Sequence, residues 1–299
     1  MEDLLVYLHF VVLPQMIDAL VIGVALAVVA LGLTMIFGLL DVINLAHGDL
    51  YMLGGYAAFT LLGWGAGYWG ALVLVPILIG LIGWGLEELG IRPLLARADR
   101  ATVTLLLTFG VSLMLRDLAQ VVWGTDTHAV TAPFTGMASM AQVFVPTYRL
   151  FIFGAGVLAI GATWWLVYRT RIGAVLRATA VDPGMVASFG IPIRLVYGLT
   201  FMYGCALAGL ASVLLSPIYA VFPTMGHDFL VLAFAVVIVG GMGSITGAVV
   251  AALLLSQVQG LASLWIPPVW AETMVYGLML LVLVVRPSGL FGRAEARKV

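Results

Sequence analysis

The chain has 299 residues, of which 63% are hydrophobic and only 9% are charged, and its mean hydropathy is +1.17. A soluble domain carries about 25% charged residues, so this composition excludes a soluble globular protein and indicates a protein embedded in a membrane. A spanning helix needs roughly 20 mostly apolar residues, and the length therefore allows about eight to ten spans with no soluble domain beside them.

Several classes of chemistry are excluded by residue counts. Lys298 is the only lysine, and a P-loop needs a lysine at its phosphate site, so the chain is not itself a P-loop ATPase. Cys205 is the only cysteine, which excludes an internal disulfide and a cysteine-rich metal site. The four histidines are scattered without metal-ligand spacing. We expect no metal or other cofactor in this chain and no nucleic acid partner.

Nine apolar segments, taken in chain order, are predicted to form helices. They cover residues 16–38, 42–62, 70–89, 102–122, 149–168, 195–216, 228–242, 245–263 and 270–286. The sequence thus predicts an all-α polytopic integral membrane protein, one transmembrane domain over residues 1–299, with about 8–9 transmembrane helices. Glycine and polar residues interrupt two of these segments, so we predict broken or re-entrant elements near residues 38–48 and 240–247.

The basic residues predict the orientation, because lysine and arginine gather in cytoplasmic loops. Eleven of the thirteen lie in the loop after the third segment, in the segment of residues 169–194 and in the tail of residues 287–299 with the preceding Arg286. These regions, including the C-terminus, are predicted to be cytoplasmic, and the loops of residues 123–148 and 217–227 periplasmic. Nine crossings place the N-terminus outside, whereas an incomplete crossing by residues 42–62 places it inside.

A polar cluster interrupts the second segment, where Asp41, Asn44, His47 and Asp49 lie beside Gly48. A charge at the bilayer centre costs about 2.5–3.5 kcal/mol on insertion scales, so these groups must face protein or water. One reading is a helix break that lines a substrate pathway, as in transporters with discontinuous helices. The other is a cytoplasmic turn in which Asn44 and Asp49 cap helices. Both remain open at this stage.

A second cluster, Gly240, Gly241, Gly243 and Ser244, follows the seventh segment. It also has two readings, because small residues allow close helix packing, here with Gly243 and Gly247 at a four-residue spacing, and also allow a backbone break in a pathway. Together with Asn44, His47, Gly48 and Asp49, these four residues form the predicted substrate pathway.

Charged residues elsewhere in the apolar segments favour structural roles. Arg116 and Asp117 are neighbours on one helix and point about 100° apart, so each needs a separate partner. For these we expect snorkelling or ion pairs with residues such as Glu272 or Asp18 rather than substrate contacts. Glu87 and Glu88 precede Arg92 at a helix end, where a solvated role is expected.

The segment of residues 169–194 is the longest water-compatible stretch of the chain. Residues 174–180 favour a helix, Asp182 and Pro183 are typical of a helix start, and Gly190 of its end. A helix of about seven residues is marginal in water by itself. Its apolar composition favours docking into a groove of a partner, or else a turn resting on the membrane surface.

Four motifs resemble one known family. They read GLTMIFGLLDVINLAHGDLYMLG, LRATAVDPGMVASFGI, VVIVGGMGSITGA and RPSGLFGR, and the resemblance runs from about residue 15 to the C-terminus. The chain resembles the LivH-type inner-membrane permeases of branched-chain amino acid ABC importers. The resemblance implies a second, LivM-like permease, two ATP-binding subunits that hold the ATP and magnesium, a periplasmic substrate-binding protein and surrounding lipid.

The resemblance also implies site residues. The coupling segment that such permeases insert into their ATPases corresponds to Leu176, Arg177, Ala178, Ala180, Asp182, Pro183, Met185, Ala187 and Gly190.

The chain departs from the family pattern at Asp18-Ala19 and at residues 26–28, and related permeases serve urea, amides or aromatic acids. A different class of function, an ATP-independent secondary transporter, would use Asp41, His47, Asp49 and Arg116 as an ion relay.

Overall fold

The computed structural model describes residues 6–95, 97, 99–140 and 143–292. Within them lie fourteen helical elements and one two-stranded hairpin. The long helices are α2 (Leu13–Leu40), α4 (Gly67–Leu86), α5 (Arg100–Trp123), α6 (Thr147–Arg169), α9 (Ile193–Leu215), α11 (Ile245–Ala262) and α12 (Pro268–Val285). The shorter elements are η1 (Leu8–Val12), α3 (His47–Gly63), η2 (Glu87–Ile91), η3 (Arg92–Leu94), α7 (Arg171–Val181), α8 (Pro183–Ser188) and α10 (Met225–Gly240), with strands β1 (Met137–Met140) and β2 (Val143–Pro146).

In the described chain seven helices are long and apolar enough to cross a membrane. The shorter α3 and α10 correspond to the second and seventh predicted segments. The prediction of an all-α polytopic fold is therefore confirmed, and each of the nine predicted segments contains one helix. The hairpin β1–β2 was not predicted. The predicted cytoplasmic tail of residues 287–299 lies partly outside the described residues, because Arg293, Arg297 and Lys298 fall in residues 293–299.

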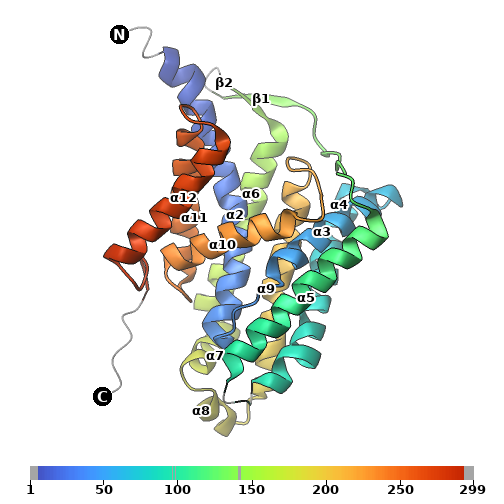
Figure 1. Ribbon diagram of the computed structural model, residues 1–299, viewed down its shortest axis with the longest axis vertical. Coiled ribbons are helices and arrows are strands. Elements are labelled where there is room, and N and C mark those ends of the chain that lie inside the picture. Colours follow the sequence, from blue (N-terminus) through green and yellow to red (C-terminus); the bar gives the residue numbers. More distant parts are fainter. Residues whose placement is uncertain (1–5, 96, 98, 141–142, 293–299) are drawn as a thin grey trace.

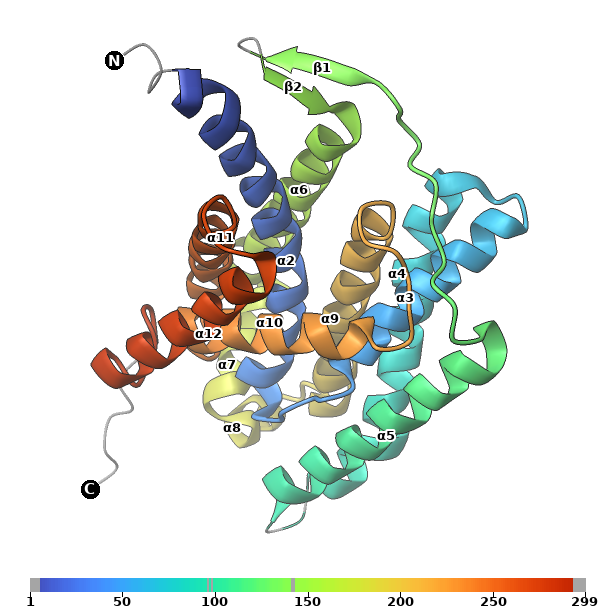
Figure 2. The same ribbon diagram turned by 45° about the horizontal axis from the view of Figure 1, so that its top comes forward.

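Helix α2 is the centre of the fold. It runs the length of the molecule, with α6, α9, α10 and α11 packed around it, whereas α10 lies across it (Figures 1 and 2). Small residues allow this close packing, as expected for helices in a membrane. A Cβ at Gly32 would overlap the backbone of Gly204 on α9, and one at Gly23 would overlap the Ser256 side chain on α11. Two glycine contacts thus allow α2 to pack closely against α9 and α11.

The two ends of the molecule differ. Helices α7 and α8 lie at one end, together with the first turns of α5 and α9, and we call this the basic end because Arg100, Arg169, Arg171 and Arg194 lie there. The hairpin β1–β2 and the first described residues lie at the opposite end (Figure 1). At that end an isolated bridge pairs His128 with Val221. The chain therefore enters the fold at the end opposite to its basic loops, as nine crossings require.

Glu87 and Glu88 differ from the prediction of a solvated role. Glu87 is fully buried, and Arg92 lies between the two carboxylates, donating from its Nε to Glu87 at 3.1 Å and forming ion pairs with both. Arg194 at the start of α9 adds a third ion pair, to Glu88. A buried carboxylate needs such partners, so these residues join the end of α4 to the start of α9.

Candidate substrate pathway and coupling surface

The segment between α2 and α3 turns back into the fold. Helix α2 ends at Asp41, which adopts the left-handed conformation at φ 54°. The chain then runs back along α2 until the His47 ring lies 3.3 Å from the carbonyl oxygen of Val29. The helix from Val29 to Leu40 rises about 16 Å. Helix α3 therefore begins deep in the fold, and the predicted re-entrant element near residues 38–48 is confirmed.

A hydroxyl group on α5 satisfies the backbone of this segment. Thr108 accepts a hydrogen bond from the N–H of Leu45 at 3.2 Å and lies at the same distance from the Ile43 carbonyl, to which it donates. Asn44 accepts from the N–H of Ala46 at 3.1 Å. Irregular backbone at membrane depth is tolerated only where its polar groups are satisfied by protein or water. Helix α3 has no side-chain cap, so the alternative in which Asn44 and Asp49 cap helices is wrong.

Replacing Thr108 with valine is expected to lower the free energy of unfolding by about 1–3 kcal/mol, because backbone groups are left without partners. Thermal unfolding in detergent measures this change. The matched control is Thr104→Val, since Thr104 is equally buried and bonds only within its own helix. Equal effects of the two substitutions would contradict the role given to Thr108.

Four polar residues on α5 share a regular spacing, which indicates a polar face of this helix turned toward the segment between α2 and α3. Thr104, Thr108, Ser112 and Arg116 recur every four residues and thus lie on one face of the helix. Ser112 donates to the Asp49 carboxylate, and the positive charge of Arg116 acts on the same carboxylate. Thr108 and Ser112 were not predicted as site residues, although the four-residue spacing is visible in the sequence.

Helices α3 and α10 cross at a pair of glycines. A Cβ at Gly48 would overlap the carbonyl oxygen of Gly226, and one at Gly226 would lie 2.6 Å from the carbonyl oxygen of Gly48. Both glycines lie in the first turn of their helices. The N-termini of two helices, each carrying a partial positive charge, therefore meet within the fold. Gly48 was among the predicted pathway residues, whereas Gly226 was not.

The second break separates α10 from α11. Gly241 and Gly243 adopt φ angles of 100° and 80°, which only glycine adopts readily, and Ser244 caps α11 by accepting from the N–H of Gly247 at 3.1 Å. The predicted element near residues 240–247 is confirmed. Gly240 packs on Gly247, so that a Cβ at Gly240 would lie 2.5 Å from the Gly247 carbonyl. The break thus coexists with close packing, but the glycine that packs on Gly247 is Gly240 and not the predicted Gly243, which lies in the break before α11.

The first and second breaks are in contact. A Cβ at Gly38, near the end of α2, would lie 3.0 Å from the Cα of Gly243. Motion of either break must therefore disturb the other. This contact brings the two halves of the predicted pathway together on the side of the molecule that holds the basic end.

The polar atoms of the first cluster are only partly satisfied. Asn44 and His47 are fully buried and Asp49 is 1% exposed. Within the described part of the chain, Asn44 Nδ2, His47 Nδ1 and Asp49 Oδ1 have no hydrogen-bond partner. Buried polar groups are generally hydrogen-bonded, so these three buried atoms need partners that the described residues do not supply.

Ionisable groups also gather on the outer surface formed by α5, α10 and α12, which we call the polar face. His227 and Asp228 are exposed, and Arg116 and Glu272 are half-buried. The polar face lies at the front of the molecule in Figure 2, with α10 between α12 and α5. The expected ion pairs are wrong, because Asp18 pairs with Arg149, and Glu272 accepts a hydrogen bond from Tyr276 at 3.4 Å.

The opposite surface is different in kind. Helix α4 and residues 150–168 of α6 contain no charged residue, and their outward positions include the exposed Val73, Leu158 and Trp165. A surface of this kind suits lipid, whereas exposed charges in contact with lipid are costly. On the polar face, the exposed His227 and Asp228 therefore require a protein partner or water.

The coupling segment has the predicted local structure. Thr170 caps α7 by accepting from the N–H of Gly173 at 3.1 Å, and Asp182 caps α8 by accepting from the N–H of Met185 at 3.0 Å. Pro183 is the first residue of α8, and Gly190 follows the helix at φ 79°. Helix α7 is longer than the predicted residues 174–180. A strand-like link at Asp182 separates the two helices.

Most predicted coupling residues are exposed. They are Arg177, Ala178, Ala180, Asp182, Pro183, Met185, Ala187 and Gly190, whereas Leu176 is half-buried. Arg177 donates to the Val167 carbonyl, and its guanidinium lies 5.6 Å from the centre of the Tyr168 ring, so it holds α7 against α6. Val181 and Phe189 are 83% and 75% exposed. With Met185 they border an apolar cavity of about 400 Å³ between α7 and α8.

A smaller cavity joins the coupling segment to both breaks. It has a volume of about 90 Å³, and its walls include Leu176, Arg177 and Ala180 of α7, Thr34 and Gly38 of α2, and Gly243. Residues of the coupling segment and glycines of both breaks therefore line the same cavity.

Comparison with known proteins identifies close relatives. A family model described as the permease component of branched-chain amino acid transport systems matches residues 15–284. The high-affinity branched-chain amino acid permease LivH of Escherichia coli K12 is 31% identical, over 98% of this chain and 99% of its own. BraD of Pseudomonas aeruginosa is 32% identical over 96% and 98%, and LivM of E. coli 25% identical over 94% and 71%. No solved structure matches.

Proposed function

The chain belongs to the family of permease components of branched-chain amino acid transport systems, and on that premise we propose how it works within an ABC importer. It is a multi-pass inner-membrane permease subunit. In the proposal a second permease of the LivM type completes the pathway, and two ATP-binding subunits drive it. A periplasmic binding protein delivers a branched-chain amino acid, and the basic end and the C-terminus lie in the cytoplasm.

The observation that carries this proposal is the coupling segment. Val181, Met185 and Phe189 of the coupling segment expose apolar side chains, and α7 and α8 lie at the basic end (Figure 1). Exposed apolar patches bordered by polar residues are typical of interaction sites. A docked ATP-binding subunit would cover them and supply the ATP hydrolysis that this chain, without a P-loop lysine, cannot perform.

Movement passes from the coupling segment to the pathway through the contacts described above. Closure of the ATP-binding subunits displaces α7 and α8, and Arg177 transmits the displacement to α6. The cavity shared with Gly38 and Gly243 lets α7 bear on both breaks. ATP and substrate must each favour one of two states, since a ligand with equal affinity for both shifts nothing.

The second permease covers the polar face in this proposal, and the substrate passes between the two permeases. An amino acid carries both charges. The first turn of α10, where His227 is exposed, suits its carboxylate, as helix N-termini do in other transporters. Asp228 and Glu272 form no ion pair within the described residues and suit its ammonium group. Asn44, His47 and Asp49, with their free polar atoms, lie behind this passage.

The ion relay of a secondary transporter has less support. Asp41 does not face the other proposed members, because its side chain is 73% exposed and lies 3.8 Å from Arg100. Its distance from the buried His47 and Asp49 leaves no continuous relay among the described residues. We therefore retain the ATP-driven importer, with urea, amides or aromatic acids as the alternative substrates.

Purification of the complex in mild detergent tests the partner set and the substrate. We expect the chain to co-purify with a second permease and two ATP-binding subunits. Titration calorimetry on the associated binding protein is expected to show heat with leucine, isoleucine or valine and none with urea or benzoate. Recovery of the chain without any ATPase would contradict the proposal.

A further inference from the structure

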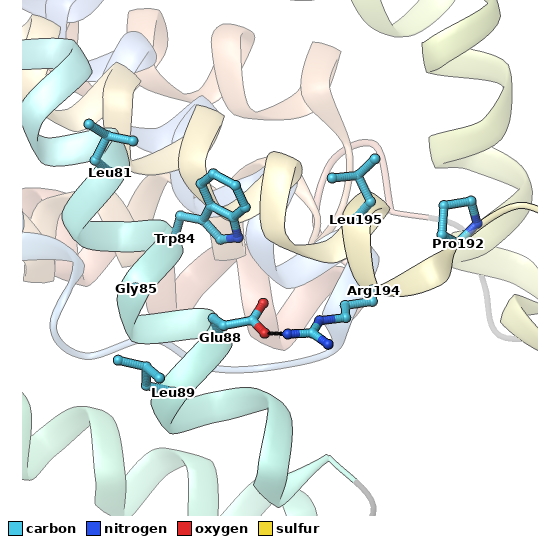
Figure 3. Close-up of a pocket in the computed structure, with 8 residues that line it drawn as sticks. All are labelled: Leu81, Trp84, Gly85, Glu88, Leu89, Pro192, Arg194 and Leu195. Carbon is cyan, nitrogen blue, oxygen red and sulfur yellow. Dashed lines mark ion pairs between the residues drawn. The ribbon is translucent and has the colours of Figure 1, made fainter.

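A cavity of about 610 Å³ lies between the end of α4 and the start of α9. Its walls are Leu81, Trp84, Gly85, Glu88, Leu89, Pro192, Arg194 and Leu195 (Figure 3). The figure shows Leu81 and Trp84 on one side and Leu195 on the other, with the ion pair of Glu88 and Arg194 below them. The cavity thus has an apolar upper part and a charged floor.

The cavity opens on the lipid-like surface of the molecule. Above it, Ile77, Leu78 and Leu81 of α4 are each about half exposed, and so is Leu199 of α9. Helix α4 has no charged residue from Gly67 to Leu86. The apolar wall of the cavity therefore continues directly into the surface that suits lipid chains, away from the polar face assigned to the second permease.

The charged floor lies at the basic end. Arg92 and Arg194 bring two positive charges, and Glu87 and Glu88 bring two negative charges, so the floor is neutral as a whole. Arg92 also donates to the carbonyl oxygen of Arg194 at 3.0 Å. The Arg194 side chain is 74% exposed and that of Glu88 is 25% exposed. Both charges are accessible to a molecule in the cavity.

We propose that this cavity binds one phospholipid of the adjoining leaflet that carries an amino headgroup. The phosphate accepts hydrogen bonds from Arg194, since arginine is suited to phosphate, and the primary ammonium donates to Glu88. The acyl chains run upward along Leu81 and Leu195. A neutral floor, in which the exposed guanidinium of Arg194 lies beside the carboxylate of Glu88, offers a partner to each charge of a zwitterionic headgroup and matches it better than an anionic one. A quaternary choline group has no N–H to donate and binds more weakly.

The position of the site links the lipid to the coupling segment. Gly190 is the last predicted coupling residue, and α9 begins three residues later at Ile193. Pro192 and Arg194 lie at this junction. A lipid held on Arg194 thus fixes the end of the coupling segment that adjoins α9. This inference concerns the membrane and does not rest on the identity of the transported substrate.

Photo-crosslinking tests the site in the assembled complex. The probe is phosphatidylethanolamine with a photoreactive group near its headgroup, added to nanodiscs of phosphatidylcholine. Crosslinks are expected on residues 81–89 and 192–195. Unlabelled phosphatidylethanolamine should compete about tenfold better than phosphatidylglycerol or phosphatidylcholine, which corresponds to about one charge-assisted hydrogen bond.

Two variants keep the test decisive. Gly85→Leu fills the cavity without steric conflict, because a Cβ at Gly85 meets no atom within 4 Å, and it leaves the charged floor intact. Its matched control is Gly154→Leu on the lipid-like surface of α6, where the Cβ is equally free.

Arg194→Gln removes the phosphate partner, with Arg169→Gln as control. Loss of crosslinking in Gly85→Leu and Arg194→Gln alone supports the site. Crosslinks spread along α4 and α6, equal competition by the three lipids, or unchanged crosslinking in Gly85→Leu overturns it.

Discussion

Replacement of Ala187 by glutamate is expected to abolish the substrate-stimulated ATPase activity of the assembled complex while leaving membrane insertion unchanged. Ala187 is exposed on α8, the helix whose Met185 and Val186 line the apolar cavity. A carboxylate buried without a partner in a docked interface costs about 3–5 kcal/mol, which corresponds to a loss of docking of more than about 100-fold. The activity is measured with the binding protein and substrate present.

Gly190 provides a second route to the same result. Its φ of 79° lies in the left-handed region, so Gly190→Val strains the link between α8 and α9 and is expected to abolish stimulation as well. Gly190→Asn is the matched control, because asparagine tolerates this conformation. Ala187→Ser is the control for Ala187→Glu. Unchanged stimulation in Ala187→Glu and Gly190→Val would show that α8 does not couple the subunits.

Replacement of Gly48 by valine is expected to abolish uptake, the second large effect. The added Cβ would overlap the carbonyl oxygen of Gly226 and would lie 2.6 Å from the Cβ of Leu230, so α3 and α10 could not keep their crossing. Backbone atoms cannot move aside as a flexible side chain can, and overpacking of a tight core costs about 1–3 kcal/mol or more. Uptake in proteoliposomes and the yield of assembled complex are both measured.

Two glycines with free space around them, one on α3 and one on α5, are the controls for Gly48. At Gly63 on α3 and Gly110 on α5 an added Cβ meets no atom within 4 Å. Valine at either position is expected to leave uptake near the wild-type level. If Gly48→Val transports as well as Gly63→Val, the first turns of α3 and α10 do not need to meet during transport.

Seven helices of the described chain were predictable because each is an apolar run long enough to cross a membrane. The apolar pattern does not indicate whether a helix runs along its neighbours or across them. Helix α10 reads as a short span, yet it lies across α2 (Figure 2). Tertiary contacts alone determine this, chiefly the crossing of Gly226 with Gly48 and the junction of Gly240 with Gly247.

Local signals predicted the coupling segment well, and long-range contacts explain what was missed. Asp182, Pro183 and Gly190 determine where α8 begins and ends through their own backbone preferences, so their sequence positions suffice. Thr108 matters only because Ile43 and Leu45 return to it from another helix. In the same way, charge alone did not reveal that Asp18 pairs with Arg149 or that Glu87 is buried.

ATP-driven uptake by proteoliposomes tests the central claim most directly. The vesicles contain this chain, the second permease and the two ATP-binding subunits, with binding protein and labelled leucine on one side and ATP on the other. We predict accumulation that requires ATP and all four membrane-associated subunits, and none with this chain alone or with Ala187→Glu. Gradient-driven uptake by this chain alone would contradict the account.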